Sequence, residues 1–292
     1  LFQLVGQVGQ PHHIGIHLLP IHSIEERFQL RGVGGRVPGP PLSGVLPEEA
    51  FDVMPYAEAA GEYLMGFIRA VRFPRKLKVA FSSSPANESH ATFRDLGFVA
   101  KSNRTFDVYA AGGLGVRPYM GVRVAGDVLP EDVLYHIKAM VDTFTAYGNY
   151  ESRAKSRSRF LQETLGADGL IRAYQEKLRQ ALDTEQLKLS VSKQPVTKKA
   201  VGPLLCGNRI LPQRQKGLYA VFYQPVGGFL SPIKAAQLSR AIAPMEDAEI
   251  RLTPEGGLYI INCNAQEAAL LCSVTQDGAQ TQFEASAACV GA

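Results

Sequence analysis

Apolar residues in the first two thirds of the chain repeat with the spacings of both helices and strands. The clearest helix is expected over residues 129–147, where apolar side chains recur every three or four positions from Val133 to Phe144. Pro130 suits the first turn of this helix, and Gly148 marks its end. Short apolar runs between turn residues predict buried strands. The other elements expected here are a helix at 54–69, strands at 77–81, 97–100 and 106–110, and a helix at 157–182 that is interrupted near 166–169.

The pattern changes after residue 183. Residues 184–202 are polar and rich in lysine without a period, which is typical of a linker. Apolar runs then resume in the order strand, helix, strand, strand, helix, an order that fits a small half-domain with an antiparallel sheet. Its expected elements are 217–223, 231–242, 248–252, 258–262 and 266–274. The fold class predicted for the whole chain is therefore α+β.

Composition limits the classes of function. The 292 residues are 46% hydrophobic and 20% charged, which suits about two domains of roughly 150 residues each. No apolar run approaches the roughly 20 residues that span a bilayer, and no signal sequence is visible, so we expect a cytoplasmic protein without a membrane partner. The net charge of +4 is too weak to indicate nucleic-acid binding, but it suits a site that attracts anions.

Four cysteines are scattered along the chain without a C-x-x-C pair. By themselves they indicate neither a disulfide framework nor a zinc site, and small buried side chains are the ordinary interpretation. The sequence also contains no Ser-His-Asp set, no pair of catalytic carboxylates and no H-E-x-x-H motif. Hydrolytic chemistry is therefore poorly supported.

A short basic run opens the first expected strand. Alternation along a strand places Lys76 and Lys78 on one face and Leu77 on the other. Two ammonium groups so placed repel each other by roughly 1 kcal/mol at surface dielectric, and a bound anion would relieve that repulsion. Arg75 adds a planar fork suited to a carboxylate. The alternative is a solvated edge of the sheet.

Two further segments have similar alternatives. The glycines around Gly112 and Gly113 follow a strand, where they either let a bulky ligand approach backbone amides or simply form a tight turn. This run is not the dinucleotide-binding fingerprint. The basic residues of 153–159 form either a clamp for a phosphate or carboxylate or a solvated surface. Few aromatic residues accompany them, which argues against nucleic acid.

Together these segments resemble one family. Residues 73–82, FPRKLKVAFS, resemble the P-R-K-x-K strand of the sulfite and nitrite reductase haemoproteins. Segments similar to that family's follow in its order, and the resemblance covers about residues 41–292. The segments that carry it are 95–100, 109–115, 148–149 with the basic residues after it, 209–213, 217–219, 251–253 and 286–292.

The resemblance implies a six-electron reduction of sulfite to sulfide or of nitrite to ammonia at sirohaem coupled to a 4Fe–4S cluster. Lys76 and Lys78 would hold the sulfite or nitrite, and Arg75 would contact sirohaem carboxylates. The electron donor would be ferredoxin or a flavoprotein. The alternatives are a non-catalytic module that binds a tetrapyrrole or an anion, and an inactive gene fragment.

The resemblance also implies which residues face the cofactors. Gly112, Gly113 and Leu114 would lie against the macrocycle, while Asn149 and Arg153 would bind its peripheral carboxylates. Cys289 matches the first cysteine that ligates the cluster. Two positions depart from the family: Ala111 stands for the first glycine of its G-G-G-L run, and Tyr150 for an arginine.

The same resemblance implies a domain organisation. We expect the chain to be incomplete, because three further cluster cysteines would follow Ala292, and we do not expect it to assemble the coupled sirohaem and 4Fe–4S cluster by itself, because one cysteine cannot hold a four-iron cluster. The expected divisions are an irregular, unassigned segment at 1–39, a sirohaem- and 4Fe–4S-type domain at 40–183, a linker at 184–202, a ferredoxin-like half-domain at 203–275, and the truncated start of a second cluster-binding domain at 276–292.

Overall fold

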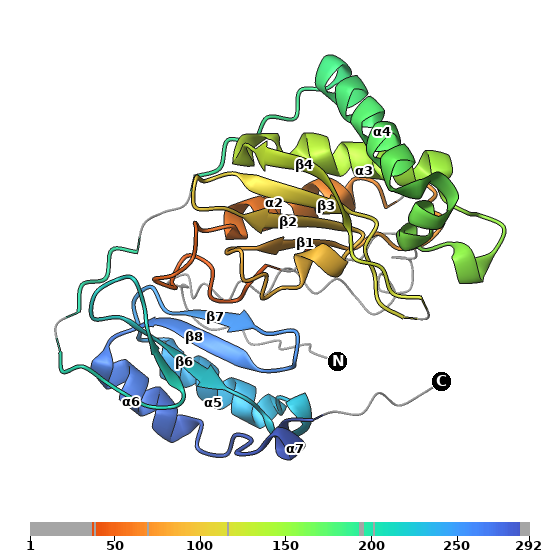
Figure 1. Ribbon diagram of the computed structural model, residues 1–292. Coiled ribbons are helices and arrows are strands. Elements are labelled where there is room, and N and C mark those ends of the chain that lie inside the picture. Colours follow the sequence, from red (N-terminus) through yellow and green to blue (C-terminus); the bar gives the residue numbers. More distant parts are fainter. Residues whose placement is uncertain are drawn as a thin grey trace. The chain divides into compact units, whose positions relative to one another are not determined.

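The computed structural model describes residues 37, 39–68, 70–115, 117–192, 196–200 and 202–286. These residues form two compact units, a first unit up to residue 192 and a second unit from residue 196 (Figure 1). Each unit combines a four-stranded sheet with helices. The α+β class predicted from the sequence is therefore confirmed. Within the described residues, every helix is too short or too polar to cross a bilayer.

The sheet of the first unit has its strands in chain order, β1-β2-β3-β4. Strands β1 and β2 run parallel, while the β2–β3 and β3–β4 pairs are antiparallel. Residues on β3 alternate between the buried and the partly exposed side, as expected for a strand with one face on the core. The bounds of the strands are β1 Val79–Ser82, β2 Leu96–Ala100, β3 Phe106–Ala110 and β4 Val122–Val128.

Helices and aromatic rings fill the core beside this sheet. Phe81 stacks on Phe98 with ring centroids 4.6 Å apart, and both rings meet the edge of Phe106. Apolar side chains of three helices pack into the same core. The opposite face carries a small cluster in which a short 3₁₀ turn packs on the strands. The helices are α2 Met54–Met65, α3 Val133–Tyr147 and α4 Leu161–Thr184, and the turn is η1 Ala91–Phe93.

The structure corrects three expectations about the first unit. The expected strand at 77–81 begins only at Val79, because the Lys78 amide donates to the side chain of Asp95. The helix expected from residue 157 begins at Leu161, and two 3₁₀ turns precede it, η3 Arg153–Lys155 and η4 Ser158–Phe160. Strand β4 was not expected, because its burial pattern is irregular and Gly126 interrupts it.

Other elements agree more closely with the sequence. The helix expected at 129–147 is present as α3 with a 3₁₀ turn before it, η2 Pro130–Asp132. The interruption expected near 166–169 occurs at Gly166, where φ is +70°. Residues 1–36 and 287–292 lie outside the described residues, and with them most of the irregular segment and Cys289.

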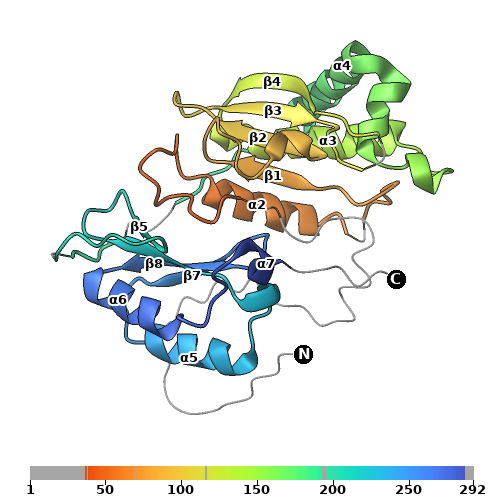
Figure 2. The ribbon, with the colours of Figure 1, turned by 60° about the horizontal axis from the view of Figure 1, so that its bottom comes forward.

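The second unit has a wholly antiparallel sheet in the order β5-β6-β8-β7. Helices α5 and α6 cover one face of it (Figure 2). Side chains of Ser231 and Asn264 accept hydrogen bonds from backbone amides and cap these helices, as their residue types favour. The bounds are β5 Ile210–Pro212, β6 Tyr219–Tyr223, η5 Val226–Gly228, α5 Pro232–Ile242, β7 Glu249–Leu252, β8 Leu258–Cys263, α6 Ala265–Val274 and α7 Gln282–Ala285.

Candidate anion and tetrapyrrole site

The two predicted substrate lysines lie just before β1. Leu77 between them is fully buried, whereas Lys76 is exposed and Lys78 is half-buried. Alternation of side chains along extended backbone therefore leaves both ammonium groups on the side away from the core. The pKa of Lys78 is lowered, first by burial and then by cations around it. The cations that lower it are Lys76, Arg157 and Arg94.

Arg75 joins the same group of charges. Its pKa is lowered by burial and by the guanidinium groups of Arg153 and Arg157. Arg157 therefore lies close enough to both Arg75 and Lys78 to lower the pKa of each. Asp95 joins the segment before β1 to the segment before α4 through its hydrogen bonds to the Lys78 amide and the Ser158 hydroxyl. We call the resulting set of six residues the cationic cluster. Its members are Arg75, Lys76, Lys78, Arg94, Arg153 and Arg157.

A buried carboxylate lies beneath the cationic cluster. The Oδ2 atom of Asp95 accepts a hydrogen bond from the Lys78 amide at 2.7 Å, and its Oδ1 atom accepts one from the hydroxyl of Ser158. Burial raises the pKa of Asp95, although these hydrogen bonds and the charges of Arg157 and Lys78 act to lower it. Six cations less one carboxylate leave an excess of five positive charges where the carboxylate is ionised.

The glycine loop, residues 111–115, packs against the segment before β2. A Cβ atom on Gly112 would lie 2.7 Å from the carbonyl oxygen of Thr92, so this glycine lets the chain's own backbone approach closely. Ala111 has a φ of +59°, a left-handed conformation that the glycine of the family's pattern would adopt without strain. A Cβ atom on Gly113 would have only ordinary contacts, with the side chain of Arg159.

Apolar side chains are exposed beside this loop. Leu114 is 66% exposed and Met120 is 56% exposed. The Nε2 amide of Gln162 donates to the carbonyl oxygens of Ala111 and Met120, at 2.8 and 2.7 Å, and so ties the loop to α4. An apolar platform next to a cluster of cations suits a flat macrocycle whose edge carries carboxylates.

The predicted carboxylate ligands occupy the turn after α3. The Oδ1 atom of Asn149 accepts from the amides of Glu151 and Ser152, so its side-chain oxygen is used within the turn. A ligand carboxylate would therefore meet its amide nitrogen. Arg153 is exposed and lies close enough to Arg75 to lower the pKa of its guanidinium. Tyr150 takes a structural role, because its hydroxyl bonds the carbonyl of residue 145 at 3.0 Å.

The structure brings together most, but not all, of the residues that the sequence predicts. The described residues contain no group of three or more His, Cys, Asp or Glu side chains that would hold a metal ion. Cys289 lies outside them, so the geometry of the predicted cluster ligand is not described. Sequence reasoning missed Arg94, whose buried Nε atom has no hydrogen-bond partner within the described part of the chain. It also missed Asp95, because one acid at the start of a strand carries no recognisable pattern.

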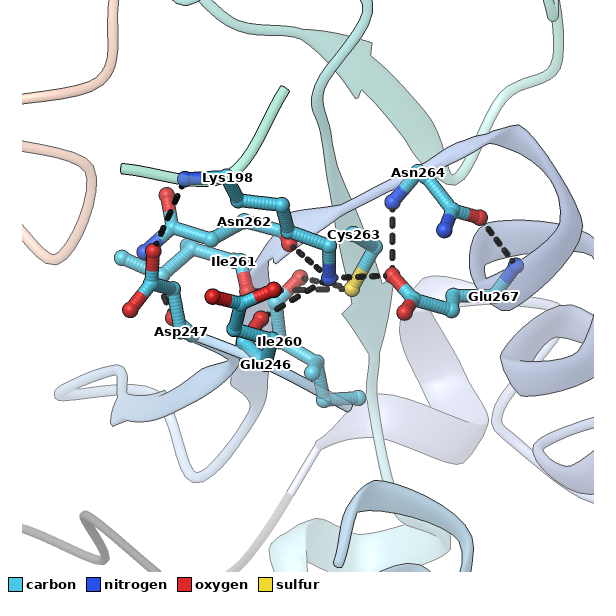
Figure 3. Close-up of polar contacts among 9 residues, drawn as sticks. All are labelled: Lys198, Glu246, Asp247, Ile260, Ile261, Asn262, Cys263, Asn264 and Glu267. Atoms are coloured by element: carbon cyan, nitrogen blue, oxygen red, sulfur yellow. Dashed lines mark hydrogen bonds and ion pairs between the residues drawn. The ribbon is translucent and has the colours of Figure 1, made fainter. Parts of the chain in front are cut away.

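A second polar cluster lies in the second unit and is complete in itself. The Nζ atom of Lys198 donates to the carbonyl oxygens of Glu246 and Asn262, at 2.8 and 2.9 Å, and to the carboxylate of Glu267 at 2.5 Å (Figure 3). These three bonds use every donor of the ammonium group. Burial raises the pKa of the neighbouring Cys263 to about 12, so it is not a thiolate at neutral pH. This cluster stabilises the unit and offers no donor to a ligand.

Comparisons with known proteins identify the family of the chain. Residues 36–182 match the family model of the nitrite and sulphite reductase 4Fe-4S domain. The chain is 25% identical to the chloroplastic ferredoxin–nitrite reductase of Spinacia oleracea, over 77% of this chain and 38% of that protein. It is 28% identical to the sulfite reductase (NADPH) hemoprotein beta-component of Chromohalobacter salexigens, over 59% of this chain and 28% of that protein.

The fold has a solved counterpart. The structure of the Mycobacterium tuberculosis NirA protein matches 82% of this chain and 42% of that chain, with a TM-score of 0.61 and 26% sequence identity. The chain thus spans about two fifths of the length of the NirA chain and of the plant enzyme that it matches.

Proposed function

This chain belongs to the nitrite and sulphite reductase family, and from that premise we propose that it supplies the anion-binding, sirohaem-facing part of an enzyme that reduces sulfite or nitrite. The observation that carries the proposal is the cationic cluster, whose segments before β1 and before α4 are joined by hydrogen bonds to the buried carboxylate of Asp95. Such an excess of like charge is unfavourable without a counterion. A small oxyanion and the carboxylates of a tetrapyrrole are both suitable counterions.

Lys76 and Lys78 are the proposed substrate residues. Their ammonium groups would neutralise the negative oxygens of sulfite or nitrite and hold the anion by charge-assisted hydrogen bonds. The lowered pKa of Lys78 makes its Nζ atom a stronger acid than an ordinary lysine. This atom is therefore suited to give a proton to an oxygen that leaves as water.

The residues fit sirohaem better than they fit an iron–sulfur cluster. Arg75, Asn149 and Arg153 would hold its carboxylates, and Leu114 with the backbone of Gly113 would lie against its face. Sirohaem, when bound, supplies an iron that accepts the anion and passes electrons to it. The described residues hold no set of cysteines suited to a 4Fe–4S cluster.

We extend the proposal to the domains. The first unit would be the sirohaem- and 4Fe–4S-type domain, and the second would be a ferredoxin-like half-domain joined to it by the predicted linker at 184–202. The electron donor would be ferredoxin or a flavoprotein, in keeping with relatives named ferredoxin–nitrite reductase and NADPH sulfite reductase.

Calorimetric titration of the chain with sulfite and with nitrite at low ionic strength tests this proposal. We expect binding that weakens as salt is added, because the contacts are between charges. Lys78→Met should weaken binding by roughly tenfold, which corresponds to about 1.4 kcal/mol. Lys76→Met should have a similar effect.

Lys177→Met is the matched control, because Lys177 is a partly exposed lysine on α4 whose Nζ atom bonds a neighbouring glutamine. It removes the same charge from the same unit and should leave both affinities unchanged. Equal affinities for all three variants and the wild-type chain would contradict the proposed site. A titration with sirohaem, followed by absorption, tests the tetrapyrrole face separately.

A further inference from the structure

Asp95 connects three segments of the candidate site. Its side chain accepts one hydrogen bond from the Lys78 amide, in the segment before β1, and another from the Ser158 hydroxyl, in the turn before α4. Its backbone carbonyl accepts a third from the amide of Ala111, at the start of the glycine loop, at 2.8 Å. The lysines, the basic turns and the loop are therefore joined through one residue.

The link to Ser158 has a specific consequence for charge. Ser158 follows Arg157 directly, and Arg157 is one of the cations that lower the pKa of Lys78. Cations in the segments before β1 and before α4 repel each other, so these segments would separate if nothing held them. Ser158 is fully buried and its hydroxyl donates a hydrogen bond to the carboxylate of Asp95. This bond opposes the separation of the two segments.

We propose that Asp95 and Ser158 are positioning residues that hold Lys78 and Arg157 side by side, so that the site for a small oxyanion is formed before the anion binds. The inference rests on the proposed function for the identity of the anion. The geometry of the link does not depend on that identity. A preformed site binds more tightly, because the anion does not have to order its own ligands.

Ser158→Ala is the informative substitution, because it removes the link and keeps every charge. The matched control is Ser156→Ala, since Ser156 is also buried but, within the described residues, its hydroxyl bonds the carbonyl of Arg153 in the same segment and reaches no other segment. We expect Ser158→Ala to weaken the binding of sulfite or nitrite by roughly tenfold. Ser156→Ala should bind as the wild-type chain does.

Asp95→Asn is the conservative variant. Its side-chain oxygen can accept from the Lys78 amide while its amide group donates to the Ser158 hydroxyl, which can act as an acceptor. Both links would survive and one negative charge would be lost, so anion binding should be no weaker than in the wild-type chain. Weaker binding by a folded Asp95→Asn variant would contradict a role through these hydrogen bonds.

A second measurement needs no anion. The ¹³Cε resonance of Lys78, followed against pH, reports the charges around its ammonium group. Release of Arg157 in Ser158→Ala should raise the pKa of Lys78 toward its ordinary value, whereas Ser156→Ala should leave it where it is in the wild-type chain. A wild-type chain that binds neither anion would refute the proposed function alone. An unchanged Lys78 titration in Ser158→Ala would overturn the inference.

Discussion

A buried histidine should make the stability of the first unit depend on pH. His136 lies on α3 and is 5% exposed. Its Nδ1 atom is 2.9 Å from the hydroxyl of Tyr174 on α4, which also donates to the backbone carbonyl of His136. With its proton on Nδ1, the neutral ring donates to the hydroxyl of Tyr174, and that hydroxyl donates to the backbone carbonyl of His136. Burial lowers the pKa of His136 from 6.5 to about 4.

The sign and size of the effect follow from this shift. Between about pH 6.5 and pH 4 the unfolded chain binds a proton at His136 that the folded chain does not bind. The contribution of the neutral His136 to the free energy of unfolding is complete above pH 6.5 and is lost as the pH falls through that window. A shift from 6.5 to about 4 corresponds to about 3 kcal/mol at 1.36 kcal/mol for each pH unit.

Urea unfolding of the chain is monitored at several pH values by hydrogen-exchange mass spectrometry of peptides from α3 and α4. These peptides report the unfolding free energy of the first unit separately from that of the second. His136→Asn keeps a side-chain donor near the Nδ1 position and removes the titration, so its unfolding free energy should fall less than that of the wild-type chain. Because carboxyl groups titrate in the same range, the difference between the two profiles is the quantity of interest. The exposed His90, changed to Asn, is the matched control. Parallel profiles for wild type and His136→Asn would refute the reasoning.

Three other predictions concern stability and reactivity. Lys198→Ala should destabilise the second unit by about 3 kcal/mol in urea unfolding, because it leaves a carboxylate without its buried partner, whereas the exposed Lys199→Ala should have little effect. Iodoacetamide followed by peptide mapping should label the exposed Cys206 in the native chain and label Cys263 only after denaturation, since burial raises the pKa of that thiol to about 12. Ala111→Gly should raise the unfolding free energy of the first unit by about 1 kcal/mol in the same urea assay, because it relieves a left-handed alanine, and a loss of stability would contradict this.

Much of the fold could be predicted because the periods in the sequence are set by local geometry. Helix α3 and strand β3 have clean spacings of buried residues, and both lie where the sequence predicts them. Strand β4 lacks that alternation, so it was found only when its pairing with β3 was visible. The sequence predicts residues 157–160 as the start of the helix, because a serine hydroxyl that bonds a distant carboxylate leaves no local signal.

The candidate site also contains some residues that the sequence predicts and others that only the structure reveals. Lys76 and Lys78 could be named because charge alternates with a buried leucine within three residues, and because a family pattern contains them. Arg94 could not be named, since its place beside Lys78 depends on the pairing of β1 with β2. A short pattern therefore identifies groups that act together from one segment, and it does not identify groups that tertiary contacts bring together.

Asp95 explains why such a site would keep a carboxylate among its cations. A site for anions gains attraction from each cation, but the repulsion between cations grows with every one that is added. Placing the carboxylate beneath the cluster, where its hydrogen bonds join the Lys78 amide to Ser158, offsets part of that repulsion without placing a negative group against the anion. The net positive excess still attracts a ligand, and the segments that carry it stay together in its absence. The site therefore has two separable requirements, charge from the lysines and arginines and geometry from the buried acid, which the Lys78 and Ser158 variants remove one at a time.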